Sequence, residues 1–128
     1  MQMIPRNPRD GVYAASPEYI HAMEVRSPAR FLFVSGTMGL AIDGKAPTGL
    51  EAQLALVWSN IRRILAEADM TTDNIARLTS YLRSSSFVQA NQEARIRALG
   101  ERRVPTTAIV VETLQEDWLI EIEVIAVA

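Results

Sequence analysis

The stretch "IEIEVIAVA", residues 120–128, sets the two faces of the sheet that this sequence predicts. Successive side chains of a β-strand point to opposite faces, so Glu121 and Glu123 share one face. The same face becomes apolar farther along, at Ile125 and Val127. The other face is apolar throughout and carries Ile120, Ile122 and Val124. One face therefore belongs to a core, while the other combines acids with apolar side chains.

Length and composition indicate a single domain that spans residues 1–128. The chain has 128 residues, of which 48% are hydrophobic, and this suffices for a core. Charged residues make up 22% of the chain, and its formal net charge is −2. A dedicated nucleic-acid binder normally presents a basic stripe, so we expect no nucleic-acid partner.

Residues that hold metals or form disulfides are scarce. The chain has no cysteine and a single histidine, His21, which excludes thiolate sites and any metal site built from several histidines. The start, "MQMIPRNPRDG", lacks the apolar stretch of a secretory signal, and no apolar run reaches transmembrane length. We therefore expect a cytoplasmic protein without a metal or a membrane partner.

The first third of the chain predicts an arm and two strands. Residues 1–17 contain three of the six prolines and predict an irregular N-terminal arm. Residues 19–25, "YIHAMEV", and 30–36, "RFLFVSG", predict strands, and "RSPA" between them predicts the turn.

Two helices are expected in the middle of the chain. In "TGLE", Thr48 and Glu51 have the spacing of a capping box, and apolar residues follow at helical intervals up to Ala68. "SFVQ" at 86–89 repeats the capping-box spacing and predicts a second helix, with a weaker signal, that ends at Gly100.

Strands are also predicted at 75–83, 106–112 and 118–127, which gives the order β-β-α-β-α-β-β. This is an α+β fold, a mixed sheet with both helices on one face. The helices should cover the face that holds Leu78, Leu82, Ile120 and Ile122.

The other face should hold both apolar and charged side chains. Its expected members are Phe31, Phe33, Tyr81, Arg83, Glu121, Glu123, Ile125 and Val127. It is too apolar to remain in water and too polar for the core of a monomer. We expect another subunit to cover it.

Three segments together resemble the Rid (YjgF) family of reactive-intermediate deaminases. They are "FLFVSGTMGL" before a long amphipathic helix, "NIARLTSYLRS", and the terminal "IEIEVIAVA". The resemblance implies a chorismate-mutase-like fold and a homotrimer whose sheets line a central barrel, with small-molecule clefts between subunits. It also implies hydrolysis of imines and enamines to a keto acid and ammonia without a metal or a cofactor.

The family's cleft residues correspond to particular positions here. Its early tyrosine matches Tyr19, or Tyr13 in another register, and the serine of its "SG" turn matches Ser35. Its helical asparagine matches Asn91. Its water-activating acid matches Glu121, and the backbone carbonyl that also holds this water falls at Ile109.

One departure concerns the segment "VPTTAIVV". The family's deaminases carry an arginine two residues after the proline, which binds a substrate carboxylate in a two-pronged contact. Here that position is Thr107, which has no charge. Arg103 and Arg83 are the candidate replacements. The resemblance with this loss predicts a substrate other than the usual 2-imino acid.

Simpler interpretations remain open for several of these residues. Glu121 and Glu123 could simply form the hydrated side of a half-exposed strand. Tyr19 could be a packing residue. Older names for the family mention ribonuclease activity, but the sequence has neither a basic groove nor paired histidines. Two functions are therefore kept: a hydrolytic deaminase, and a ligand-binding sensor or regulator without turnover.

Overall fold

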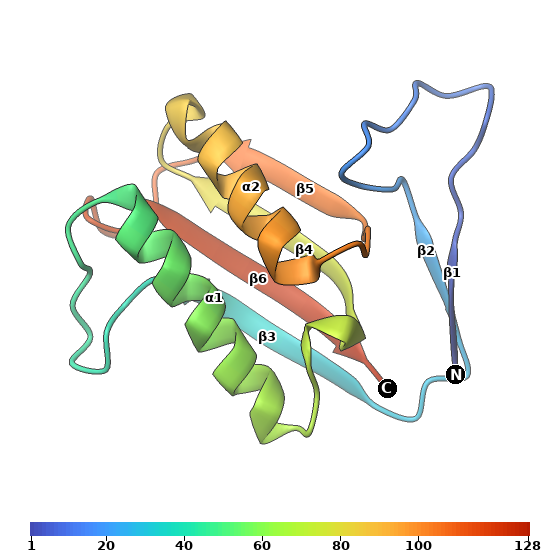
Figure 1. Ribbon diagram of the computed structural model, residues 1–128, viewed down its shortest axis with the longest axis horizontal. Helices are drawn as coiled ribbons and strands as arrows, with labels where there is room; N and C mark the ends of the chain where they lie inside the picture. The colour runs from blue at the N-terminus through green and yellow to red at the C-terminus, as the bar shows by residue number, and fades with distance from the viewer.

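The computed structural model describes all residues 1–128, and the chain forms two helices and six strands (Figure 1). The elements in chain order are β1 (Gln2–Pro5), β2 (Met23–Arg26), β3 (Phe31–Met38), α1 (Leu50–Glu67), β4 (Ile75–Leu82), α2 (Val88–Leu99), β5 (Thr106–Val110) and β6 (Ile120–Val127). Two 3-10 turns, η1 (Thr72–Asn74) and η2 (Ser85–Phe87), precede β4 and α2.

The main sheet has four strands in the order β3-β6-β4-β5, and both helices lie on one of its faces (Figure 1). Strand β6 runs antiparallel to β3 and β4, while β4 and β5 are parallel. The predicted α+β mixed sheet with two helices is confirmed. The C-terminal stretch is therefore an inner strand, which joins β3 to β4.

The helix-covered face forms the core, as its apolar pattern predicts. Leu78, Leu82, Ile120 and Ile122 are each at most 1% exposed. They pack in one cluster with apolar residues of both helices, including Leu54, Val57, Ile61, Leu65, Ala94 and Ala98. Apolar burial of this kind contributes roughly 25 cal/mol for each Å² removed from water.

No element of the chain covers the opposite face, which we call the bare face. Phe31 is 57% exposed and Phe33 is 74% exposed, and their rings stack with centroids 6.1 Å apart. Val127 and Thr79 are exceptions, because they are 1% and 7% exposed although their strand positions assign them to this face. Large exposed aromatic side chains that adjoin one another mark an interaction surface.

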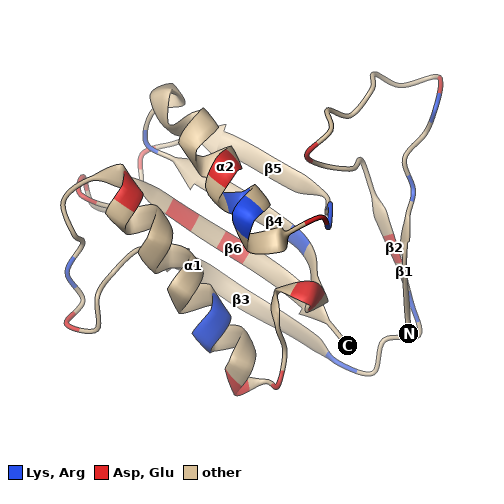
Figure 2. Ribbon diagram, viewed as in Figure 1, with Lys and Arg blue, Asp and Glu red and all other residues tan.

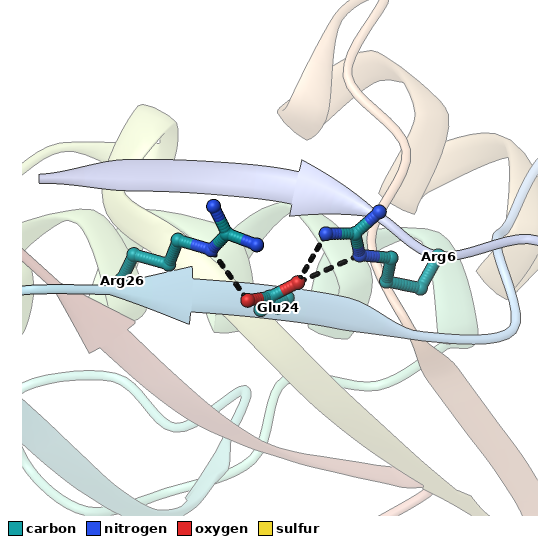
Figure 3. Close-up of polar contacts among 3 residues, drawn as sticks. All are labelled: Arg6, Glu24 and Arg26. Carbon is teal, nitrogen blue, oxygen red and sulfur yellow. Dashed lines mark hydrogen bonds and ion pairs between the residues drawn. The ribbon is translucent and has the colours of Figure 1, made fainter.

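The N-terminal region differs from the prediction. Residues 2–5, expected to be irregular, form β1, which pairs with β2 in a separate two-stranded sheet. Glu24 accepts hydrogen bonds from Arg26 and Arg6 in this hairpin (Figure 3), and both contacts lower the pKa of its carboxyl. The remaining arm, residues 6–17, has no helix or strand.

The strand expected at 19–25 begins only at Met23, and it does not pair with β3. The backbone N–H groups of Ala29 and Arg30 instead donate to the carbonyl of Ala128, at 2.8 and 2.9 Å. The "RSPA" segment therefore connects two sheets, because the residues after Pro28 are already paired with the C-terminus.

Both predicted capping boxes are wrong. The N-cap of α1 is Gly49, at φ 98°, and no side chain caps the helix, which begins later than Thr48 would place it. Helix α2 follows η2 directly and also lacks a side-chain cap, whereas Gly100 ends it as predicted. The capping box in the chain is at η1, where Thr71 and Asn74 exchange side-chain and backbone hydrogen bonds.

Two polar residues on α1 fix the strand ends that carry the candidate site. The Asn60 side-chain amide donates to the carbonyls of Met38 and Leu40, at 3.1 and 3.0 Å. The Gln53 side chain donates to the carbonyl of Asp117 at 2.7 Å and accepts from the N–H of Leu119 at 3.0 Å. Helix α1 therefore sets both the end of β3 and the start of β6.

Candidate functional site

Glu121 lies on the bare face against the "SG" segment of β3. The register between β3 and β6 is irregular between Val34 and Thr37, so Ser35 and Gly36 form a bulge opposite the backbone of Glu123, while Glu121 pairs with Met38. A Cβ atom built on Gly36 would stand 2.7 Å from Oε2 of Glu121. The missing side chain of Gly36 therefore gives the carboxylate its space. The carboxylate of Glu121 makes no hydrogen bond or ion pair within the chain.

Glu123 shares the bare face but has a partner. The Tyr81 hydroxyl donates to Oε1 of Glu123 at 2.5 Å, although the direct cross-strand neighbour of Tyr81 is Glu121. This hydrogen bond, together with desolvation, raises the pKa of Tyr81 above its ordinary value. The two acids of "IEIE" thus have different surroundings: one carboxylate is engaged by a phenol, and the other is free.

Thr107 and Ile109 lie on β5 in register with these acids. Thr107 is opposite Thr79, which is opposite Glu123. Ile109 is opposite Tyr81, which is opposite Glu121. Strand β4 separates β5 from β6, so each acid is about 10 Å from its counterpart on β5. All are on one face, but Glu121 leans toward β3 and away from Ile109.

Arg83 is committed to a structural contact. Its guanidinium donates from Nε to Oγ1 of Thr113 at 2.8 Å and from Nη2 to the carbonyl of Thr113 at 3.0 Å. The single hydroxyl proton of Thr113 is in turn shared between the carbonyls of Gln115 and Trp118, at 2.9 and 2.6 Å. Arg83 therefore orders the link between β5 and β6, and this contact occupies the fork that a substrate carboxylate would need.

A cavity of about 610 Å³ opens beside the edge strand β3. Ser35, Gly36 and Met38 line it from the strand, and Asn60 and Arg63 line it from α1. Arg63 is exposed on α1, and nothing in the sequence assigns it to this cavity. Its place near the "SG" bulge follows from the packing of α1 over β3, which helical periodicity alone does not specify.

The remaining predicted residues lie elsewhere. Tyr19 is half-buried beside the start of β5, where the neighbouring Ile20 bridges Pro105. Its ring meets that of His21 edge-on at 5.9 Å, and Tyr13 meets His21 in the same way at 5.0 Å. His21 contacts the Tyr13 carbonyl through Nε2 at 2.7 Å.

Asn91 and Arg103 belong to the helix layer. Asn91 is 3% exposed on the buried side of α2, and its Oδ1 has no hydrogen-bond partner. Arg103 is exposed after α2 and lines another cavity. The predicted site thus divides into a bare-face group around Glu121 and a group around α2 and Tyr19, and one subunit does not bring the groups together.

Sequence reasoning missed Arg95, which is 6% exposed on α2 without an ion pair. Its spacing of one helical turn from Asn91 was the available signal. No group of three or more His, Cys, Asp or Glu side chains in the chain has a geometry that would hold a metal. No helix combines the length and apolarity needed to cross a bilayer.

Comparison with known proteins identifies the family. The sequence profile of the family described as endoribonuclease L-PSP matches residues 12–128. The chain belongs to this family, which is also named Rid. A RutC family protein of Aquifex aeolicus is 30% identical over 113 residues, covering 85% of this chain and 87% of that protein. A RutC family protein of Pyrococcus abyssi is 30% identical over 110 residues, covering 84% of each chain.

Solved structures of Rid relatives share the fold. A Rid family protein of unknown function from Yersinia pestis is 26% identical, covers 100% of both chains and has a TM-score of 0.85. A protein from Thermotoga maritima described as a putative endoribonuclease is 24% identical, covers 95% of this chain and 91% of that chain, and has a TM-score of 0.72. This likeness supports the fold alone. Membership of the Rid family is confirmed, and the roles of individual site residues stay predictions.

Proposed function

We propose that the protein acts as a homotrimer that binds a small molecule in clefts between subunits. The exposed Phe31 and Phe33 support an assembly that covers the bare face. The division of the candidate residues supports the same idea. Glu121 lies on one face of the sheet, and Asn91 belongs to the helix layer on the other, so residues of two subunits are needed to form one cleft.

The proposed reaction is hydrolysis of a reactive imine, or of an enamine through its imine form. Water adds to the C=N carbon, the resulting carbinolamine expels ammonia, and a carbonyl compound remains. Glu121 accepts a proton from the water as it attacks and returns it to the leaving nitrogen. No cofactor is needed, because the reaction neither oxidises nor reduces the substrate.

The observation that carries this proposal is the contrast between the two acids. A general base needs a free carboxylate within reach of the water, and Glu121 has one. Glu123 is bonded to Tyr81. The Glu121 side chain points toward Gly36, so we expect the attacking water to bind on the side of the carboxylate that faces β3. The Ile109 carbonyl joins the site only if the carboxylate turns toward β5.

Thr107 supports a substrate other than a 2-imino acid with its carboxylate held at this position. The bare face offers no replacement fork there, because Arg83 is bonded to Thr113. We expect an imine whose other substituents are neutral or are held elsewhere. The same loss favours the second candidate function, a sensor that binds a ligand without turnover.

Ribonuclease activity, which the family description names, has little support in this chain. The net charge is −2, and the only histidine contacts the Tyr13 carbonyl and lies apart from the Glu121 group. Acid–base cleavage of RNA needs paired proton-transfer groups beside a cationic surface for the phosphates.

A substrate screen tests the proposed function. Imines would be generated in place by an amino-acid or amine oxidase with catalase present, and ammonia release would be followed with and without the protein. The expected result is faster hydrolysis of at least one imine. If the protein accelerates the hydrolysis of no imine in a broad panel, but small molecules still raise its melting temperature, the sensor function is the better account.

A further inference from the structure

Arg63 is the only charged residue that lines the cavity of about 610 Å³ beside the edge strand β3. It is exposed on α1 and makes no hydrogen bond or ion pair within the chain. Glu67, one helical turn farther along, lines a neighbouring cavity together with Arg63 but forms no ion pair with it. The guanidinium of Arg63 is therefore free to bind an anion that enters the cavity.

The cavity extends around the free edge of the sheet. Strand β3 pairs only with β6, so the backbone N–H and C=O groups along its outer edge have no partner strand. Phe33 of the bare face lines the cavity, and Asn60 and Arg63 line it from the helix layer. Figure 2 shows the basic segment of α1, in blue, beside β3, which carries no charged residue. A ligand in this cavity therefore contacts both layers of the fold.

Gly36 connects this cavity to the proposed base. It lines the cavity, and Oε2 of Glu121 is 2.7 Å from the position that a Cβ atom on Gly36 would occupy. Ser35 lines the cavity as well, and its side chain makes no hydrogen bond within the chain. A substrate whose C=N carbon lies beside Glu121 at Gly36 can therefore place its remaining atoms in the cavity.

We propose that Arg63 binds an anionic group of the substrate and so performs the task of the arginine that Thr107 replaces. This inference rests on the proposed function, because it places the reacting carbon beside Glu121. A guanidinium binds a carboxylate through two parallel hydrogen bonds, which fix the orientation of the ligand as well as its position. The size of the cavity is in the range of small-molecule sites.

The position of Arg63 also limits the substrate class. Arg63 approaches from the helix layer and Glu121 lies on the other face, so the backbone of β3 separates them. A carboxylate attached directly to the C=N carbon is too close to that carbon to reach Arg63. The substrate we infer is an imine whose carboxylate is separated from the C=N carbon by at least two methylene groups. Apolar residues that suit such a chain also line the cavity, namely Met38, Leu40 and Ile64.

Calorimetric titration of the purified protein with 4-oxopentanoate tests this proposal. This keto acid has two methylene groups between its carbonyl carbon and its carboxylate, and it has no C=N bond to hydrolyse. Pyruvate carries its carboxylate directly on the carbonyl carbon, and methyl 4-oxopentanoate lacks the charge. We expect 4-oxopentanoate to bind roughly tenfold more tightly than either, because hydrogen bonds to a charged group contribute most of the difference.

Three variants separate Arg63 from its surroundings. Arg63→Met should weaken the binding of 4-oxopentanoate by roughly tenfold or more and should leave the binding of the methyl ester unchanged. Arg63→Lys keeps the charge without the fork, so its binding should be intermediate. Arg62→Met is the matched control, because Arg62 is exposed on the same helix but lines the groove between α1 and α2. It should bind 4-oxopentanoate as the wild type does.

Two outcomes would overturn the proposal outright: no binding of 4-oxopentanoate to the wild type, or equal binding by the wild type and Arg63→Met. A loss in Arg77→Met in place of Arg63→Met would move the anion to the bare face, where Arg77 lines a smaller cavity with Glu123. That result would also contradict the proposal.

The same measurements distinguish this proposal from the proposed function. If neutral imines are hydrolysed but Arg63→Met binds 4-oxopentanoate normally, Arg63 is not the anion-binding residue and the deaminase function stands. If binding depends on Arg63 but no imine is hydrolysed, the anion site stands and the deaminase function fails.

Discussion

Ile122 and Phe33 lie on neighbouring strands of the main sheet, but Ile122 is fully buried beneath the helices and Phe33 is 74% exposed. Both faces are rich in apolar side chains, so apolar content alone does not distinguish them. The helices close one face within the chain, whereas the bare face mixes Phe33 with charged groups such as Glu121. A face of this composition needs a partner that supplies both apolar contact and a polar boundary.

The largest effect is expected from a charge on the bare face. Phe33→Asp should prevent trimer formation, because burying an unpaired carboxylate at an interface costs several kcal/mol. Light scattering on the purified variant measures the assembly. A trimer of unchanged stability would mean that Phe33 is not at the interface.

Matched truncations should separate the two faces next. Ile122→Ala should lower the free energy of unfolding by about 2–5 kcal/mol, because it leaves a cavity in a closed core. Phe33→Ala should mainly weaken association and leave the isolated subunit almost unaffected. Denaturant unfolding over a range of protein concentrations resolves the two effects. Equal, concentration-independent losses would contradict the assignment of the faces.

The C-terminal strand shows what the sequence alone could predict. Its alternation correctly separated Ile120 and Ile122 from Glu121, and the apolar periodicity of α1 correctly predicted a helix. The β1–β2 hairpin was missed because a four-residue strand that includes Pro5 carries little pattern, and its pairing joins residues about twenty apart. The predicted cap of α1 failed because the helix begins after Gly49, which has a positive φ, and the predicted cap of α2 failed because the helix begins directly after the 3-10 turn η2.

The candidate site was less predictable for a physical reason. The family resemblance supplied Glu121 and Thr107, but no pattern indicated that Tyr81 bonds diagonally to Glu123. The buried side of α2 contains Asn91 and Arg95, so its polarity hides the helical face from any search for apolar periodicity. Buried polar groups become visible only when their lack of partners can be seen.

A smaller effect is expected from restoring the arginine on β5. The wild type should hydrolyse 2-iminopropionate weakly, and Thr107→Arg should raise this activity at least tenfold, equivalent to about 1.4 kcal/mol. Thr106→Arg is the matched control, because Thr106 points to the helix side of the same strand. Strong wild-type activity, unchanged by Thr107→Arg, would show that the position does not select the substrate.

The smallest effect concerns the hydrogen bond between Tyr81 and Glu123. The raised pKa of Tyr81 means that the bond stabilises the fold below pH 10 and that this contribution is lost as pH rises through the folded-state pKa. Tyr81→Phe should therefore flatten the decline of stability above pH 10, measured by denaturant unfolding. If the free energy of unfolding depends on pH identically in the wild type and in Tyr81→Phe, the bond does not contribute to stability.

The central claim is that the two acids of "IEIE" have different roles, and one paired measurement tests it. With a substrate from the imine screen, kcat would be measured for Glu121→Gln and Glu123→Gln, after both variants are shown to fold and assemble as the wild type does. Glu121→Gln should lose about a hundredfold or more, because an amide cannot accept the proton. Glu123→Gln should change kcat little, since its carboxylate is bonded to Tyr81. A larger loss in Glu123→Gln than in Glu121→Gln would contradict the assignment of Glu121 as the base.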